Sequence, residues 1–120
     1  DGVFFEYDTE SNCFTYVSRR AQSLLGFSLA DWLTPNFWAE RLHPQDAPRV
    51  MATCTALTEA GVDHVLDYRF VAADGRVVWV HDIVSVAPRA GRTPLLSGVM
   101  LDVTREREHE RLIEQLLHSA

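Results

Sequence analysis

The chain has 120 residues, of which 47% are hydrophobic and 23% are charged, and its formal net charge is −6. The length predicts a single domain, and the composition is that of a folded globular protein rather than a disordered one. A nucleic-acid surface needs clustered positive charge, and a membrane-spanning helix needs roughly 18 or more apolar residues in a row. Neither feature is present, so we expect no nucleic-acid partner and no membrane contact by this domain.

The two cysteines, Cys13 and Cys54, fall in different predicted elements. Neither has a second cysteine or a histidine at a metal-ligand spacing, so no metal site is expected. Nothing in the composition requires a disulfide, and a reducing cytoplasm is the expected location, which is compatible with a membrane-anchored receptor. The chain begins at Asp1 with no methionine and no signal-peptide pattern, and we expect it to be an excised piece of a longer protein.

Short elements are expected in the first half of the chain. Val3–Asp8 and Cys13–Ser18 predict two aromatic-rich strands joined by a turn. Three short helices should follow, and the residues suited to cap their N-termini are Ser18, Ser28 with Asp31, and Asn36. Gly26 is placed to end the first of these helices.

A longer helix is expected after the HPQD loop, with Asp46 as its cap and Gly61 at its end. Its inward positions recur at helical spacing and are Val50, Met51, Cys54 and Leu57. The hydrophobic period then changes to two, and HVLDYRFVA, RVVWVHDIVSVA and PLLSGVMLDV predict three long antiparallel strands. The chain as a whole predicts an α+β domain: a five-stranded antiparallel sheet with short helices on one face.

Four stretches together resemble a PAS domain, the sensory module of many bacterial signalling proteins. They are VSRRAQSLLGFS, HPQD, DYRFVAADGRVVWV and LSGVMLDVTRERE, and they extend over essentially the whole chain. The resemblance implies the PAS fold, with residues 1–104 as the sensor domain and residues 105–120 as a C-terminal amphipathic signalling helix.

The flavin-binding branch of this family leaves marks that can be tested. Flavin-binding relatives carry a reactive cysteine in an Asn-Cys-Arg-Phe motif on a mid-domain helix, whereas Asn12-Cys13-Phe14 falls on a predicted strand. Those relatives also carry amide side chains on the last three strands, where this chain has Phe70, Val80 and Met100. Because apolar groups cannot hydrogen bond the edge of the flavin ring, a flavin is disfavoured.

Haem needs an axial ligand, usually a histidine that points into the pocket. The helix expected over Ala47–Ala60, where haem-binding relatives commonly carry this ligand, contains no histidine. His43 suits a turn, and His64 is the inward candidate on a strand, where a backbone hydrogen bond is the favoured role. Haem is therefore unsupported, and the identity of any cofactor stays open.

A hairpin turn centred on Gly75 places Phe70 opposite Val80 and Tyr68 opposite Asp82, with Trp79 and His81 on the other face. A buried carboxylate is costly unless it is hydrogen bonded, and the Tyr68 hydroxyl is placed to satisfy Asp82. Alternatively, both are polar anchors of an apolar ligand pocket. The predicted pocket residues are Leu66, Tyr68, Phe70, Val80, Asp82, Leu96 and Met100.

The tail predicts a helix capped by Thr104, with a narrow apolar stripe of Leu112, Ile113, Leu116 and Leu117. One interpretation is an amphipathic helix folded back on its own sheet. The interpretation that the family favours is a signalling helix that leaves the core, begins a parallel coiled coil and leads to an output domain.

Three functions stay open. The favoured one is a non-catalytic sensor of a two-component or similar system, in which a small ligand changes a homodimer formed through the C-terminal helix and the sheet. Asp102 and Thr104 would relay the change to a histidine kinase, diguanylate cyclase or similar output domain. The second is a ligand-free dimerisation module whose pocket is filled by Phe70, Trp38 and Met100. The third is a small isomerase-type enzyme, which Tyr68 and Asp82 alone would mimic, but no nucleophile motif or phosphate loop accompanies them.

Overall fold

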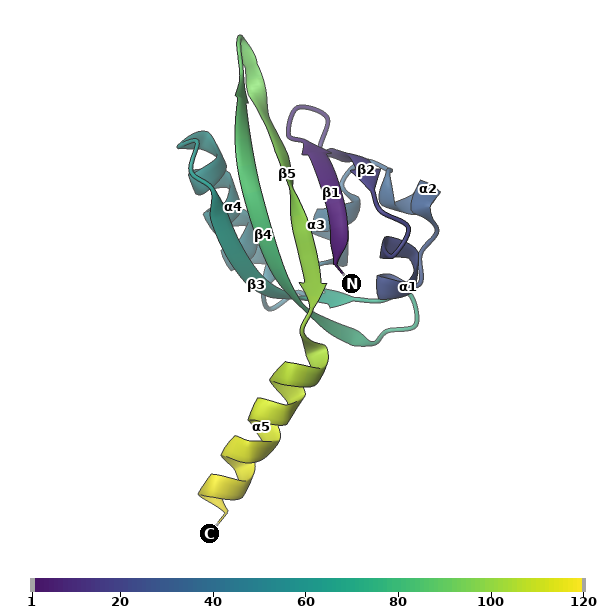
Figure 1. Ribbon diagram of the computed structural model, residues 1–120, viewed down its shortest axis with the longest axis vertical. Coiled ribbons are helices and arrows are strands. Elements are labelled where there is room, and N and C mark those ends of the chain that lie inside the picture. The colour runs from purple at the N-terminus through teal and green to yellow at the C-terminus, as the bar shows by residue number, and fades with distance from the viewer. Residues whose placement is uncertain (1, 120) are drawn as a thin grey trace.

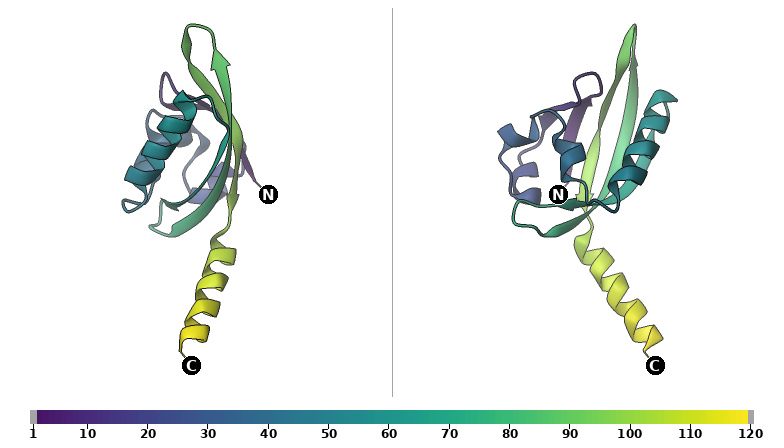
Figure 2. Two further views of the ribbon diagram at one scale, coloured as in Figure 1. Left: turned by 90° about the vertical axis from the view of Figure 1, so that its left-hand side faces the viewer. Right: turned by 180° about the vertical axis from the view of Figure 1, so that it is seen from behind.

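The computed structural model describes residues 2–119 and shows a five-stranded antiparallel sheet in the order β2-β1-β5-β4-β3. The strands are β1 (Val3–Asp8), β2 (Cys13–Val17), β3 (His64–Val71), β4 (Val77–Arg89) and β5 (Arg92–Asp102). The helices are α1 (Ala21–Leu25), α2 (Leu29–Trp32), α3 (Phe37–Arg41), α4 (Ala47–Glu59) and α5 (Thr104–His118). Helices α1 to α4 cover one face of the sheet (Figures 1 and 2), which confirms the predicted fold class.

The core lies between the sheet and these four helices. Strand β3 alternates strictly between buried and partly exposed residues, as a strand with one covered face must. The largest fully buried side chains come from both layers and are Trp32, Tyr68, Phe70, Leu25, Met100, Val50, Val78 and Val80. Trp32 meets Phe14 and Phe70 edge to face, so the short α2 is fixed by aromatic packing rather than by its own length.

The β3–β4 register differs from the prediction by two residues. Phe70 pairs with Val78 and Leu66 pairs with Asp82, because the loop from Ala72 to Arg76 is centred on Asp74 rather than on Gly75. A slip of two leaves every side chain on its predicted face. Asp82 therefore points into the core as expected, although its partner directly across the strand pair is Leu66 and not Tyr68.

Of the side-chain caps predicted for α1 to α4, one forms and three do not, although Asn36 and Asp46 do occupy the N-cap positions of α3 and α4. The Ser28 hydroxyl accepts a hydrogen bond from the Asp31 N–H, as a cap should. The Ser18 hydroxyl instead accepts from the Phe4 N–H, and the Asp46 carboxylate accepts from the Arg69 backbone and guanidinium. These side chains tie separate elements together. Asn36 precedes α3 but makes no side-chain cap, and Gly26 ends α1 with a left-handed φ of 80°.

Helix α5 leaves the lower end of the sheet and projects away from it (Figure 1), so it does not fold back on its own sheet. Its apolar stripe is exposed along its length, from 44% at Ile113 to 72% at Leu116. Among the described residues, no helix combines the length and the apolar character that crossing a bilayer would require.

Candidate functional site

A small cavity of about 40 Å³ lies between the sheet and the helices. Its walls come from β1, β2, β4, β5, α3 and α4, and the lining residues are Phe5, Tyr7, Phe14, Trp38, Cys54, Asp82, Val84 and Leu96. A cavity of roughly 150 Å³ holds one benzene molecule. The present cavity is about a quarter of that size, so the ring system of a haem or flavin does not fit into it.

Asp82 is the only charged side chain among the described residues that line this cavity. It is 3% exposed, and its Oδ2 accepts a 2.7 Å hydrogen bond from the Tyr68 hydroxyl. That hydroxyl in turn accepts from the Trp38 Nε1–H at 3.0 Å. The chain Trp38 to Tyr68 to Asp82 thus links α3 to two neighbouring strands, and it contains the Tyr68–Asp82 hydrogen bond that the sequence predicted.

The other carboxylate oxygen, Asp82 Oδ1, is buried and has no hydrogen-bond partner in the described part of the chain. Burial raises the pKa of Asp82 to about 7, although the hydrogen bond from Tyr68 opposes this rise. Burial and the nearby Asp82 charge raise the pKa of Tyr68 well above its usual value. The site therefore holds a carboxyl group that titrates near neutral pH beside a tyrosine that stays protonated.

Tyr7 and Cys54 also line the cavity, and neither was among the predicted pocket residues. Burial raises the pKa of Tyr7 to about 12. It also raises the pKa of the Cys54 thiol, whose Sγ lies 3.9 Å from Thr58 Oγ1. Both groups are therefore neutral at pH 7, and neither supplies a charge to balance Asp82.

The seven predicted pocket residues are all buried, but only two of them line the cavity. Asp82 and Leu96 line the cavity. The other five lie in the close-packed core: Leu66, Tyr68, Phe70, Val80 and Met100. The aromatic wall of Phe5, Tyr7 and Phe14 was missed, although the period of two in the first two strands was enough to place these rings on the inner face.

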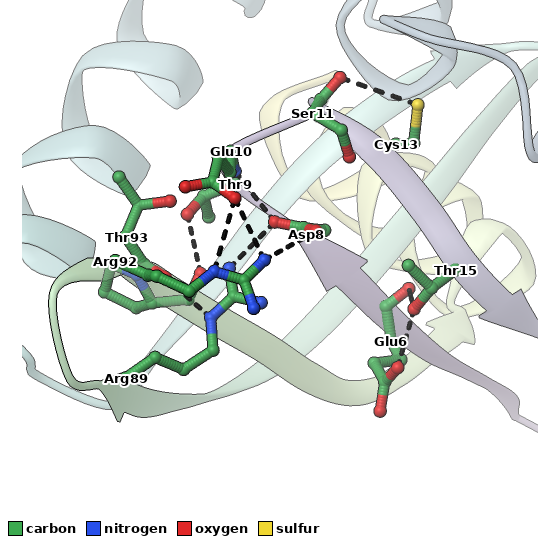
Figure 3. Close-up of polar contacts among 11 residues, drawn as sticks. Glu6, Asp8, Thr9, Glu10, Ser11, Cys13, Thr15, Arg89, Arg92 and Thr93 are labelled. Atoms are coloured by element: carbon green, nitrogen blue, oxygen red, sulfur yellow. Dashed lines mark hydrogen bonds and ion pairs between the residues drawn. The ribbon is translucent and has the colours of Figure 1, made fainter.

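An open groove of about 320 Å³ adjoins the cavity and shares four of its lining residues: Tyr7, Trp38, Cys54 and Leu96. One rim of the groove includes Thr9 from the β1–β2 turn and Pro94 from the β4–β5 hairpin. Ion pairs join these two segments (Figure 3): Arg89 lies 2.8 Å from Asp8, and Arg92 lies 2.9 Å from Glu10. The four shared side chains form the boundary between the cavity and the groove.

The junction between sheet and α5 is a compact hydrogen-bonded turn. Asp102 Oδ1 accepts from the Thr104 N–H at 3.0 Å and from the Thr104 hydroxyl at 2.6 Å. Thr104 Oγ1 accepts from the Trp79 N–H, and the Val103 N–H donates to the Trp79 carbonyl. Thr104 therefore begins α5 but does not cap it as predicted, because its hydroxyl is bonded to β4.

Trp79 is the centre of this junction, a role that the sequence did not reveal. Two guanidinium groups lie close to its ring, with Arg107 of α5 at 4.6 Å and Arg69 of β3 at 5.3 Å from the ring centroid. Arg107 is also 3.7 Å from Asp67, which is hydrogen bonded to His81 at 2.7 Å. These contacts hold the first turn of α5 against the outer face of the sheet.

The histidines and acidic groups do not form a metal site within residues 2–119. His43 accepts the Gln45 N–H in its loop. His64 is 8% exposed, and its Nδ1 is hydrogen bonded to the Val62 carbonyl, while its Nε2 is buried without a partner.

A sequence model of the family described as the PAS fold matches residues 14–100. The chain is 30% identical over 94 residues, 76% of its length, to a methyl sulfide methyltransferase-associated sensor of Methanosarcina acetivorans, and it spans 9% of that relative's length. The N-terminal domain of a diguanylate cyclase with PAS/PAC sensor from Marinobacter aquaeolei matches with a TM-score of 0.82 and 32% identity, over 89% of this chain and 99% of that one. A domain of a putative light and redox sensing histidine kinase from Haloarcula marismortui shares the fold, with a TM-score of 0.75 and 19% identity over 87% of this chain and 90% of that one.

Proposed function

Because the chain belongs to the PAS family, we propose that it is the sensory module of a signal-transduction protein, that it binds a small molecule in the cavity, and that it passes the change to an output domain. The observation that carries this proposal is the course of β5. This strand lines the cavity with Leu96, and it continues through Asp102 and Val103 directly into α5. A ligand that shifts β5 therefore also shifts the start of the helix.

The relay we propose consists of Asp102 and Thr104, with Trp79 as their anchor on β4. The Thr104 hydroxyl is bonded to both strands, since it donates to Asp102 and accepts from Trp79. A relative movement of β4 and β5 must therefore lengthen one of these hydrogen bonds or turn α5. The junction would then have two arrangements, one with both hydrogen bonds intact and one with α5 turned, and a population shift between signalling states requires two such arrangements.

We further propose that the domain acts as a homodimer through its sheet and through α5. The outer face of the sheet carries an apolar row across four strands, formed by Phe4, Val99, Ile83 and Val65, which are cross-strand neighbours. Phe4 is 60% exposed and Val65 is 51% exposed. A second copy of the chain would cover this row and the exposed apolar stripe of α5. Exposure of both apolar surfaces to water is unfavourable.

In this proposal residues 1–104 form the sensor and residues 105–120 form the helix that leads to the output domain, in the cytoplasm. The output domain would be a histidine kinase, a diguanylate cyclase or a similar enzyme. The sensor itself would not be catalytic, because Asp82 and Tyr68 are hydrogen bonded to each other and no other carboxylate or histidine lines the cavity within the described residues.

The small size of the cavity favours a second candidate function, a PAS domain that only dimerises. Native mass spectrometry of the purified domain separates the two, because it reports the oligomeric state and any retained ligand together. A dimer with added mass supports the sensor. A dimer without added mass, together with no binding in ligand screens, supports the dimerisation module.

The relay is tested in the full-length protein with Asp102→Asn and Thr104→Val, and with Ser85→Ala on the outer face of β4 as a control. We expect both relay variants to lose the response of the output domain while ligand binding stays within about twofold of the wild type. Normal signalling by both variants contradicts the relay.

A further inference from the structure

Asp82 lines the cavity, and the described residues leave one of its carboxylate oxygens without a hydrogen-bond partner. Asp82 Oδ1 is unpaired, although the side chain is 3% exposed and its other oxygen is hydrogen bonded. Leaving a buried polar atom unpaired destabilises the folded protein, and more so when the group is charged. A ligand that donates a hydrogen bond to this oxygen recovers that cost, so Oδ1 defines the polar end of a binding site.

The rest of the wall selects the charge of the ligand. Four aromatic side chains line the cavity: Phe5, Tyr7, Phe14 and Trp38. No lysine, arginine or histidine lines it among the described residues, so no basic side chain of the wall pairs with Asp82. A carboxylate repels an anion, whereas a carboxylate among aromatic rings is an environment in which small ammonium ions are recognised.

The volume limits the size of the ligand. One water molecule needs at least about 10–15 Å³ of such space, so a cavity of about 40 Å³ holds two or three non-hydrogen atoms. Methylammonium has two and dimethylammonium has three, and in both the N–H donor and the methyl group are next to each other. A larger quaternary ammonium ion exceeds the space and has no N–H to donate.

We propose that this cavity binds a small alkylammonium ion of methylammonium size, whose N–H donates to Asp82 Oδ1 and whose methyl group packs against the aromatic wall. The inference rests on the proposed sensory function and names the chemical class of its ligand. The adjoining groove supplies the approach, since Tyr7, Trp38, Cys54 and Leu96 line both spaces.

Protons and the ligand compete for the same oxygen. The cation binds the ionised carboxylate, and the pKa of Asp82 is about 7, so affinity should fall about tenfold for each pH unit below this value. An alkylammonium ion titrates near the lysine value of about 10.4 and stays charged throughout. Tyr68 of β3 is hydrogen bonded to Asp82, and Tyr7 of β1 and Cys54 of α4 line the same cavity. His64 lies on the same inner face of the sheet but pairs with Val84, and the chain neighbour His81 lies on the outer face.

The test uses the indole N–H signals of the ¹⁵N-labelled protein. The Trp38 Nε1–H is hydrogen bonded to Tyr68 and so reports on Asp82, whereas Trp79, whose ring lies 4.6 Å from the Arg107 guanidinium of α5, reports separately on the junction with the helix. Methylammonium chloride is titrated at pH 8 and at pH 6. Methanol, acetate and tetramethylammonium serve as the neutral, anionic and oversized probes.

We expect methylammonium to shift the Trp38 signal saturably at pH 8 and to bind about tenfold more weakly at pH 6. Asp82→Asn should abolish the shift, and the pH dependence in the wild type tests the same point if that variant does not fold. Saturable binding of methanol or acetate with greater affinity at pH 6 overturns the ammonium inference but leaves the sensor standing. If no probe moves Trp38 and no ligand is retained in native mass spectrometry, water alone occupies the cavity, and both proposals fail.

Discussion

Replacing Asp82 by asparagine should change how the stability of the domain depends on pH. The pKa of Asp82 rises from 3.8 in the unfolded chain to about 7 in the folded protein, chiefly because the group is buried. The folded state therefore binds the proton more tightly. The stability that this proton provides is fully present below pH 3.8 and is lost as the pH rises through 7.

The size of the effect follows from the pKa difference. One pKa unit corresponds to about 1.4 kcal/mol, so the rise amounts to about 4 kcal/mol in total. Roughly 2 to 3 kcal/mol of this should be lost between pH 5 and pH 8. The side chain introduced by Asp82→Asn has nearly the shape of the protonated acid but does not titrate. The variant should therefore gain stability relative to the wild type by about this amount over the same interval.

The measurement is urea unfolding of the wild type and of Asp82→Asn at pH 5, 6, 7 and 8, with Asp31→Asn, at an exposed position of α2, as the control. The difference in unfolding free energy between Asp82→Asn and wild type should rise with pH, with unchanged m-values. For Asp31→Asn it should stay flat within about 0.5 kcal/mol, as expected for a surface position. A flat difference for Asp82→Asn as well would refute the assignment of a buried carboxyl group with an elevated pKa.

Three further substitutions test the packing around this site and the helix junction. Tyr68→Phe removes the hydroxyl that joins Trp38 to Asp82. We expect the free energy of unfolding measured in urea to fall by about 2–4 kcal/mol, and the pKa of Asp82 to rise further in a ¹³C carboxyl titration. An unchanged pKa of Asp82 would contradict the hydrogen bond. Gly98→Ala places a methyl group against the Ile83 carbonyl oxygen, so it should cost about 3 kcal/mol or prevent folding, whereas the neighbouring exposed Ser97→Ala should be nearly neutral. Arg107→Ala removes the guanidinium that is stacked on Trp79 and should cost about 0.5–1 kcal/mol of stability. It should also speed hydrogen exchange in the first turn of α5. Equal exchange rates in Arg107→Ala and in the exposed control Arg111→Ala would show that the contact does not hold the helix.

The fold could be predicted from the sequence because its signals are local and repeated. The period of two in the last three strands is visible without any knowledge of their partners, and it placed Asp82 on the inner face. The register between β3 and β4 could not be predicted with the same accuracy, because it depends on which residue of the connecting loop lies at the loop's centre. Moving that centre from Gly75 to Asp74 changed every cross-strand pair and left every face unchanged.

The wrong helix caps at Ser18, Asp46 and Thr104 share one physical cause. All three are residue types that cap helices, and each lies where a helix starts. Their side chains accept hydrogen bonds from residues 14, 23 and 25 positions away instead: Phe4, Arg69 and Trp79. A sequence shows that an acceptor is present but not that a distant donor will reach it first.

The cavity was only partly predictable for a related reason. Asp82 and Tyr68 were recognised as a pair because both lie on one hairpin. The aromatic wall comes from β1, β2 and α3, which are distant in sequence from that hairpin, and their approach depends on how α3 packs over the sheet. Edge-to-face contacts of Tyr7 with Phe14 and Trp38 close the cavity from that side.

Strand β4 provides a second connection between the cavity and α5, beside the one through β5, which leads into the helix. Asp82 and Trp79 are three residues apart on β4 and point to opposite faces, as an odd separation in a strand requires. Asp82 lines the cavity, while both backbone polar groups of Trp79 are bonded to the start of α5. In the proposed relay, a displacement of β4 at Asp82 would thus reach the helix through the backbone of a single strand and two hydrogen bonds.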